Sequence, residues 1–135
     1  GKRGILDGVA LPLGSARLIE ADCVFGSSCA WLLLRTECGP KRVHRCVLVR
    51  PDGQVTSVGE AAAGDGWLGT WGGRCAAGPF LFVATDEGLV RVSQDGSSRA
   101  FPETEPFVEA SSRLAASPDG ILVSDGREIL LLTIS

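Results

Sequence analysis

Five cysteines and one histidine are the side chains in this sequence that could bind a metal ion or form a thiol nucleophile. Four of the cysteines fall between Cys23 and Cys46, and His44 stands two residues before the last of them. No cysteine pair has the C-x2-4-C spacing with which one turn presents two thiolates to a tetrahedral zinc ion. The spacing favours cysteine as a small apolar residue of strands, and it predicts neither a metal site nor a cofactor.

Motifs for catalysis are incomplete. A thiol nucleophile could form from Cys29 or Cys38 with His44 as its base. However, His44 lies in a basic stretch, Lys41 to Arg45, that we expect to be a solvent-exposed loop. The segment from Asp119 to Gly126 contains two Asp-Gly pairs but lacks the alternating carboxylates of a calcium loop, and two hairpin turns explain it better. We therefore expect no catalytic residues, and an enzyme with a Cys-His or metal centre is the third of three hypotheses.

The best candidate for recognition is the glycine-rich segment GDGWLGTWGG, from Gly64 to Gly73. Trp67 and Trp71 share one face if this segment is extended, because side chains alternate between the faces of a strand. Aromatic residues framed by glycines suit a binding surface, and Arg74 follows them as a third candidate residue. The alternative is that at least one of these tryptophans packs between sheets, as we expect of Trp31, which lies inside an apolar run.

Composition argues against several classes of protein. Hydrophobic residues are 44% and charged residues 21%, which is typical of a globular chain rather than a disordered one. The net charge is −3 and the basic residues are scattered, so no coherent basic face for nucleic acid is visible. Apolar runs such as Ile129 to Leu132 are too short to cross a bilayer, and no secretory signal opens the chain. With an odd number of cysteines, these features predict a cytoplasmic protein without nucleic-acid or membrane partners.

A hairpin signal recurs along the chain. The dipeptide Asp-Gly occurs six times, and the spacing from Asp7 to Asp52 is 45 residues and from Asp52 to Asp95 is 43. Glycine accepts the positive φ of a tight hairpin and Asp tolerates it. A second set of matches pairs RCAAGPFLFVAT, which begins at Arg74, with RLAASPDGILVS, which begins 39 residues later at Arg113. Together the two sets of matches indicate a repeated unit.

Each unit is predicted to contain about four short strands, because 18 glycines and 7 prolines interrupt the chain too often for long helices. The last two strands of a unit flank an Asp-Gly hairpin. In the first unit, Glu37 to Arg45 is expected to form a longer loop between strands. The first strand is expected at Ala16 to Glu20, Trp67 to Trp71 and Val108 to Ser112, the second at Cys23 to Phe25, Arg74 to Ala77 and Arg113 to Ala116, and the third at Trp31 to Arg35, Phe80 to Ala84 and Ile121 to Ser124.

The segments GPFLFVATDEGLVRVSQDG and LAASPDGILVSDGREILLL resemble blades of bacterial β-propellers in the broad kelch-, NHL- and WD-like group. The chain has no Gly-His and no Trp-Asp dipeptide, so it departs from the typical WD repeat. The resemblance implies an all-β fold of antiparallel four-stranded blades, with about three units in one domain. Residues 1–15 would end a blade, residues 16–60 and 61–104 would form one blade each, and residues 105–135 would form an incomplete blade.

Three units do not complete a ring, because propellers typically have four to eight blades. The N-terminal GILDGVALPL could supply the outer strand that the C-terminal REILLLTIS lacks. The remaining blades could come from a longer parent chain, from a second copy or from a partner. We favour a parent chain, because the sequence has no Met. A compact three-blade or sandwich-like fold is the alternative.

These features lead to a hypothesis about function. The chain is expected to be a non-catalytic protein-interaction scaffold within a larger protein or assembly, and its partner would be another protein or the remaining propeller blades. A propeller that binds a sugar or another small molecule through Trp67 and Trp71 is the second hypothesis.

Overall fold

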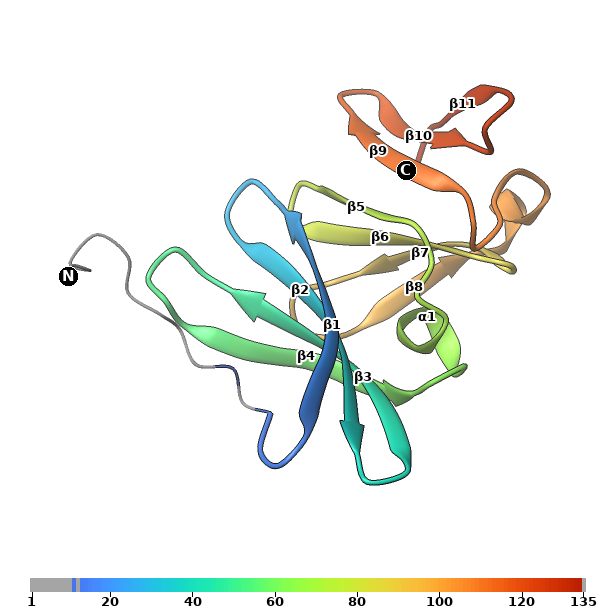
Figure 1. Cartoon of the computed structure of the whole chain (residues 1–135). Helices are drawn as coiled ribbons and strands as arrows, with labels where there is room; N and C mark the ends of the chain where they lie inside the picture. The colour runs from blue at the N-terminus through green and yellow to red at the C-terminus, as the bar shows by residue number, and fades with distance from the viewer. Residues whose placement is uncertain (1–10, 12, 135) are drawn as a thin grey trace.

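The computed structural model describes residues 11 and 13–134, which form three antiparallel β-sheets (Figure 1). The all-β prediction is therefore confirmed. In the first sheet the strands follow one another in chain order, each hydrogen-bonded to the next. Its strands are β1 (Arg17–Phe25), β2 (Ala30–Cys38), β3 (Lys41–Val49) and β4 (Val55–Ala62).

The second and third sheets repeat this arrangement. The second sheet contains β5 (Arg74–Ala77), β6 (Phe80–Thr85), β7 (Gly88–Val92) and β8 (Ser98–Phe101), and the third contains β9 (Arg113–Ser117), β10 (Gly120–Ser124) and β11 (Ile129–Leu132). A short helix, α1 (Gly66–Gly69), joins the first sheet to the second, and a 3-10 helix, η1 (Pro102–Phe107), follows β8. Within the described residues the sheets form no closed ring.

The Asp-Gly pairs at Asp52 and Asp95 form hairpin turns, as the sequence predicts, whereas the pair at Asp65 begins α1. Asp52 lies between β3 and β4, and its Oδ1 accepts a hydrogen bond from the N–H of Gln54 (2.9 Å). Asp95 lies between β7 and β8 and accepts from the N–H of Ser97 in the same way (2.9 Å). In both turns the next residue is a glycine with positive φ, 87° at Gly53 and 92° at Gly96. Asp7 and the N-terminal segment expected to complete the last blade lie outside the described residues.

Predicted first strands are mostly wrong. In the first sheet, the two segments expected as separate strands merge into β1, with a bulge between Leu18 and Glu20. The segment from Trp67 to Trp71 is not extended, because it begins in α1. The segment from Val108 to Ser112 forms no strand and connects η1 to β9. The predicted second and third strands, in contrast, lie on β5, β6, β9 and β10 and inside β1 and β2.

The expected loop from Glu37 to Arg45 is also wrong. These residues belong to β2 and β3, which pair along their whole lengths, so only Gly39 and Pro40 form the turn between them. Gly39 has φ 63°, which allows so tight a connection. His44 therefore lies on a strand and is buried, with 6% of its surface exposed, instead of lying in an exposed loop.

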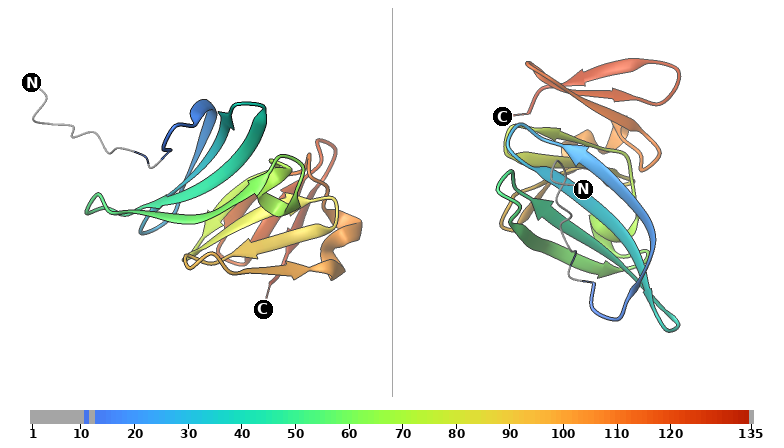
Figure 2. Two further views of the ribbon diagram at one scale, coloured as in Figure 1. Left: turned by 90° about the horizontal axis from the view of Figure 1, so that it is seen from below. Right: turned by 60° about the vertical axis from the view of Figure 1, so that its left-hand side comes forward.

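Neighbouring sheets bury one face against each other. Trp31, Leu33, Cys46 and Leu48 of the first sheet pack with Leu81, Val83 and Val92 of the second and with Leu68 of α1. A second core cluster joins the second and third sheets through Phe82, Ala84, Leu89, Ile121 and Val123, among others. The sheets fan apart from the side where β1 contacts β5 and β5 contacts β9 (Figures 1 and 2).

Two adjacent glycines before β5 lie against the backbone of β6 and of the segment that precedes β9. The N–H of Gly73 donates to the carbonyl of Ala110 (3.0 Å), and the carbonyl of Gly73 accepts from Ala84 (2.7 Å). A Cβ atom on Gly72 would overlap the carbonyl oxygen of Ala84, and one on Gly73 would overlap that of Ser112. No side chain fits at either position without moving the backbone.

We predict that Gly73→Ala lowers the free energy of unfolding by about 2–3 kcal/mol, because the added methyl group forces two sheets apart. Urea denaturation followed by circular dichroism measures the effect. Gly59→Ala is the matched control, since a Cβ at this strand glycine meets nothing within 4 Å. Equal losses of stability in the two variants would contradict the proposed close approach.

Candidate functional site

Two guanidinium groups pack over the ring of Trp71, where the first two sheets meet. The Cζ atoms of Arg35 on β2 and Arg74 on β5 each lie 4.5 Å from the centroid of this ring. His44 meets it edge-on, with the ring centroids 5.5 Å apart and an angle of 74° between the planes. Trp71 has φ 57°, a left-handed conformation that is rare for a bulky residue. A strained tryptophan thus connects β2, β3 and β5.

The two arginines over Trp71 are paired with acidic side chains of β1. Arg35 Nη1 donates to Glu20 Oε1 (2.9 Å), and Arg74 Nε lies 3.6 Å from Asp22 Oδ2. The side chain of Arg74 is only 9% exposed. Desolvation lowers the pKa of Arg74, and the Asp22 carboxylate opposes this shift. Arg35 Nε and Arg74 Nη1 are buried and have no hydrogen-bond partner among the described residues.

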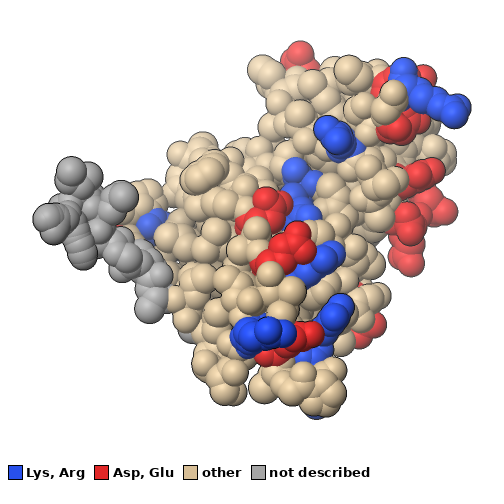
Figure 3. All heavy atoms as spheres, in the orientation of Figure 1, with Lys and Arg blue, Asp and Glu red and all other residues tan. Residues whose placement is uncertain are grey.

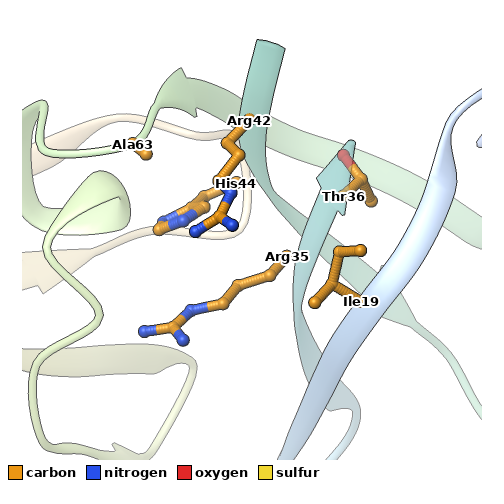
Figure 4. A pocket seen from close by; sticks show the side chains of 6 residues that line it. All are labelled: Ile19, Arg35, Thr36, Arg42, His44 and Ala63. Atoms are coloured by element: carbon orange, nitrogen blue, oxygen red, sulfur yellow. The ribbon is translucent and has the colours of Figure 1, made fainter. Parts of the chain in front are cut away.

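A pocket of 230 Å³ adjoins this cluster (Figure 4). Arg35 and His44 line it from directly paired positions on β2 and β3, and Arg42 lies two residues before His44. Arg42 Nε donates a hydrogen bond to Glu37 Oε2 (3.2 Å), and Arg17 Nη2 donates another to Glu37 Oε1 (2.6 Å). The hydrogen bond from Arg17 is the main reason why the pKa of Glu37 is lowered. Ile19, Thr36 and Ala63 complete the lining. Because carboxylates already pair with its arginines, this pocket has little positive charge left to offer an anion.

His44 makes a hydrogen bond that links two elements of the fold. Its Nδ1 lies 3.0 Å from the carbonyl oxygen of Leu68, so Nδ1 carries the proton and donates it to that carbonyl. The bond joins β3 to α1. Neither candidate nucleophile is hydrogen-bonded to His44. Instead, Cys29 Sγ accepts a hydrogen bond from Gln94 Nε2 (3.6 Å), and Cys38 Sγ lies 3.8 Å from Ser15 Oγ.

Trp67 lines a different cavity, of 530 Å³. The cavity is bounded by α1 with its flanking residues, the turn between β6 and β7, strands β7 and β8, and the start of η1. Asp86, Glu87 and Glu105 contribute carboxylates, and no Lys or Arg of the described residues lines it. This cavity combines a half-buried indole with uncompensated negative charge.

The structure brings together two of the three residues predicted to bind. Trp71 and Arg74 are in contact, whereas Trp67 belongs to the separate cavity. The reason is that α1 ends at Gly69 and Trp71 takes a left-handed conformation with φ 57°, so the i, i+4 alignment of a continuous helix does not hold for the two tryptophans.

Sequence reasoning missed Arg35 and the three carboxylates around Trp67. Arg35 could have been recognised from the sequence, because it stands two residues after Leu33 and so faces the same side of β2 as the core. The carboxylates could not, since Asp86 and Glu105 come from segments that are distant in the sequence.

All five cysteines are free thiols. Cys46 and Cys75 are buried, and desolvation raises the pKa of Cys46 to about 12 and that of Cys75 to about 11. Burial, followed by the charge of Asp22, also raises the pKa of Cys23. The two buried thiols remain protonated under ordinary conditions, so they act as small apolar residues in the core.

We predict that the free energy of unfolding falls as the pH rises above about 9. The unfolded thiols ionise near pH 9 while Cys46 and Cys75 keep their protons in the native state, so the unfolded chain binds fewer protons and stability is lost up to pH 11–12. The slope should be about 1.4 kcal/mol per pH unit for each thiol. The chain has no Tyr, and its only lysines are Lys2 and Lys41, so few other groups titrate there.

Urea denaturation at several pH values tests this prediction. Cys46→Ala should make the pH dependence shallower, whereas Cys38→Ala, which removes an exposed thiol, should leave it unchanged. A Cys46→Ala chain with the full alkaline loss of stability would show that the buried thiol is not responsible.

Further findings bear on the class of protein. No helix in residues 13–134 is long and apolar enough to cross a bilayer. The same part of the chain contains no group of three or more His, Cys, Asp or Glu side chains that could hold a metal ion. No protein-family model, curated protein or solved structure matches the sequence.

Proposed function

We propose that the chain is a set of consecutive β-propeller blades that acts as a non-catalytic protein-interaction scaffold in a larger protein or assembly. The observation that supports this proposal is the meeting of the first strands of the sheets: β1 contacts β5 and β5 contacts β9, while the rest of each sheet fans outward (Figures 1 and 2). Sheets arranged radially around a channel place one edge strand of each sheet near the centre.

Further support comes from the third sheet, which has one covered and one uncovered face. Ile121 and Val123 point toward the second sheet and are buried. The residues that alternate with them point to the opposite side of the sheet, which we call the open face. It consists of an apolar row, Ala115, Leu122 and Leu131, and of a neighbouring row, Arg113, Ser124 and Ile129. Ile129 is 70% exposed and Leu131 45%.

An apolar stripe of this kind is typical of a surface that contacts another protein. In the proposed scaffold, the open face receives the next blade, whether that blade belongs to the same parent chain, to a second copy or to a partner. The buried face of the same sheet shows what such packing requires, since it meets the second sheet with the same kinds of aliphatic side chains.

The positions of the candidate catalytic residues agree with a non-catalytic role. His44 joins β3 to α1 and packs against Trp71. The candidate nucleophiles Cys29 and Cys38 contact Gln94 and Ser15, and neither is hydrogen-bonded to His44.

We predict that the wild-type chain associates in solution in a concentration-dependent manner, because burial of the open face removes aliphatic side chains from water. Light scattering coupled to size-exclusion chromatography measures the mass. Leu131→Glu should give a monomer, since it places a charge in the middle of the contact.

Phe107→Glu is the control, because Phe107 is 51% exposed but lies on η1, away from the open face. Circular dichroism confirms that each variant is folded. A wild-type chain that stays monomeric at all concentrations would exclude a second copy as the source of the next blade. A Leu131→Glu chain that associates as the wild type does would contradict the role of the open face.

A further inference from the structure

We propose that the cavity beside Trp67 binds the guanidinium group of an arginine side chain presented by a partner protein. This inference rests on the proposed interaction function and names the chemistry that the partner must offer. Three features of the cavity carry it: the charge of its lining, the position of its indole ring, and the kinds of hydrogen-bonding groups around it.

The cavity is lined by carboxylates without nearby counter-charges. Asp86, Glu87 and Glu105 line it, and none of them forms an ion pair with a described residue. The acidic groups over the η1 side of the molecule also lack interspersed basic groups in the view of Figure 3. A concave site of one charge sign raises the local concentration of oppositely charged groups.

The arginines of the neighbouring strands point away from the cavity. Val90 on β7 and Ala100 on β8 form a cross-strand pair that lines it. Arg91 and Arg99 form the next pair and therefore project to the opposite face of the sheet, where Arg91 stacks on Phe80 (4.4 Å) and Arg99 on the ring of Phe101 (4.9 Å). The alternation of the strands thus prevents these residues from neutralising the cavity.

Turns hold the acidic residues in place. Asp86 Oδ1 accepts a hydrogen bond from the N–H of Ala110 (3.0 Å), which ties the side chain of Asp86 to the segment before β9. The N–H of Glu87 donates to Thr85 Oγ1 (3.1 Å), and Thr85 Oγ1 in turn donates to the carbonyl of Gly88 (2.7 Å). Asp86 and Glu87 therefore belong to a hydrogen-bonded turn between β6 and β7, and Glu105 belongs to η1.

Trp67 offers the surface on which a guanidinium group would stack. Trp67 packs against the first core cluster and also lines the cavity. Indole is the aromatic side chain that attracts cations most strongly. The protein already uses this contact, since Arg35 and Arg74 stack on Trp71, and no described Arg or Lys stacks on Trp67.

The hydrogen-bonding groups favour a cation over a sugar. Ionised carboxylates only accept hydrogen bonds, and the residues with side-chain donors that line the cavity are few, namely Trp67 with its indole N–H and Thr70, Thr85 and Ser98 with their hydroxyls. A neutral sugar needs a mixture of donors and acceptors, whereas a guanidinium group has five N–H donors and no acceptor. Its planar fork also pairs with a carboxylate in a bidentate manner.

Nuclear magnetic resonance of the three tryptophan indole N–H groups tests the proposal. We expect the Trp67 signal to shift in a saturable way when the acetylated, amidated peptide Gly-Arg-Gly-Arg-Gly is added. The same peptide with citrulline in place of arginine, which keeps the shape and removes the charge, should cause no shift. Added salt should weaken the arginine effect, because the site is open to solvent and its charges are screened.

Substitutions identify the residues responsible. Glu87→Gln and Glu105→Gln should each weaken binding about fivefold, as expected for the loss of one partly exposed charge contact. Glu103→Gln is the matched control, since Glu103 belongs to the same 3-10 helix as Glu105 but does not line the cavity. Trp67→Phe should also weaken binding, and calorimetry replaces the indole signal in that variant.

Several outcomes would overturn the proposal: no shift of the Trp67 signal, equal shifts with the citrulline peptide, or an equal effect of Glu103→Gln. Saturable shifts with glucose but not with the arginine peptide would identify a sugar site instead. Free arginine that binds as tightly as the peptide would identify a small-molecule site.

Repeating the titration on the Leu131→Glu chain separates this inference from the scaffold proposal. Arginine binding by a monomeric Leu131→Glu chain supports the cavity independently of assembly. Failure of the titration in a wild-type chain that associates through the open face would reject the cavity alone.

Discussion

Strand β6 is buried on both faces, and the arrangement of the other two sheets depends on it. Leu81 and Val83 point into the core shared with the first sheet, and Phe82 and Ala84 point into the core shared with the third. Alternation along one strand thus supplies apolar side chains to two cores. Since a single sheet of three or four strands cannot bury both of its own faces, each outer sheet depends on β6 and its neighbours for a partner.

The connection between the first two sheets explains the positions of the candidate binding residues. The chain leaves β4, makes one turn of α1 and reaches β5 through two glycines that lie against the backbone of β6 and of the segment before β9. Trp67 is on the helical turn and Trp71 follows it in a left-handed conformation. Consequently one tryptophan faces an acidic cavity and the other is covered by arginines. Two side chains of the same type acquire opposite roles, one in recognition under our proposal and one in packing.

The charged side chains of the first sheet form a ladder instead of an exposed basic patch. Arg17, Glu37 and Arg42 follow one another across β1, β2 and β3, and Arg35 pairs with Glu20. Pairs of this kind at the surface contribute little stability individually. Their effect is to neutralise the arginines near the pocket of Figure 4, whereas the acidic residues of the cavity beside Trp67 form no ion pair with a described residue.

The sequence by itself determined the predicted second and third strands and the Asp-Gly turns at Asp52 and Asp95, because these depend on residues that are close along the chain. The run from Phe80 to Thr85 could be recognised as a buried strand, and Asp52 and Asp95 marked hairpins, from local chemistry alone. The tertiary structure decided what depends on pairing between distant segments. His44 is buried because β3 pairs with β2 and β4 around it, and Asp86 and Glu105 share a cavity because η1 returns to the turn after β6. Strand register and sheet packing determine where these side chains lie, and neither can be read from residues that are adjacent in sequence.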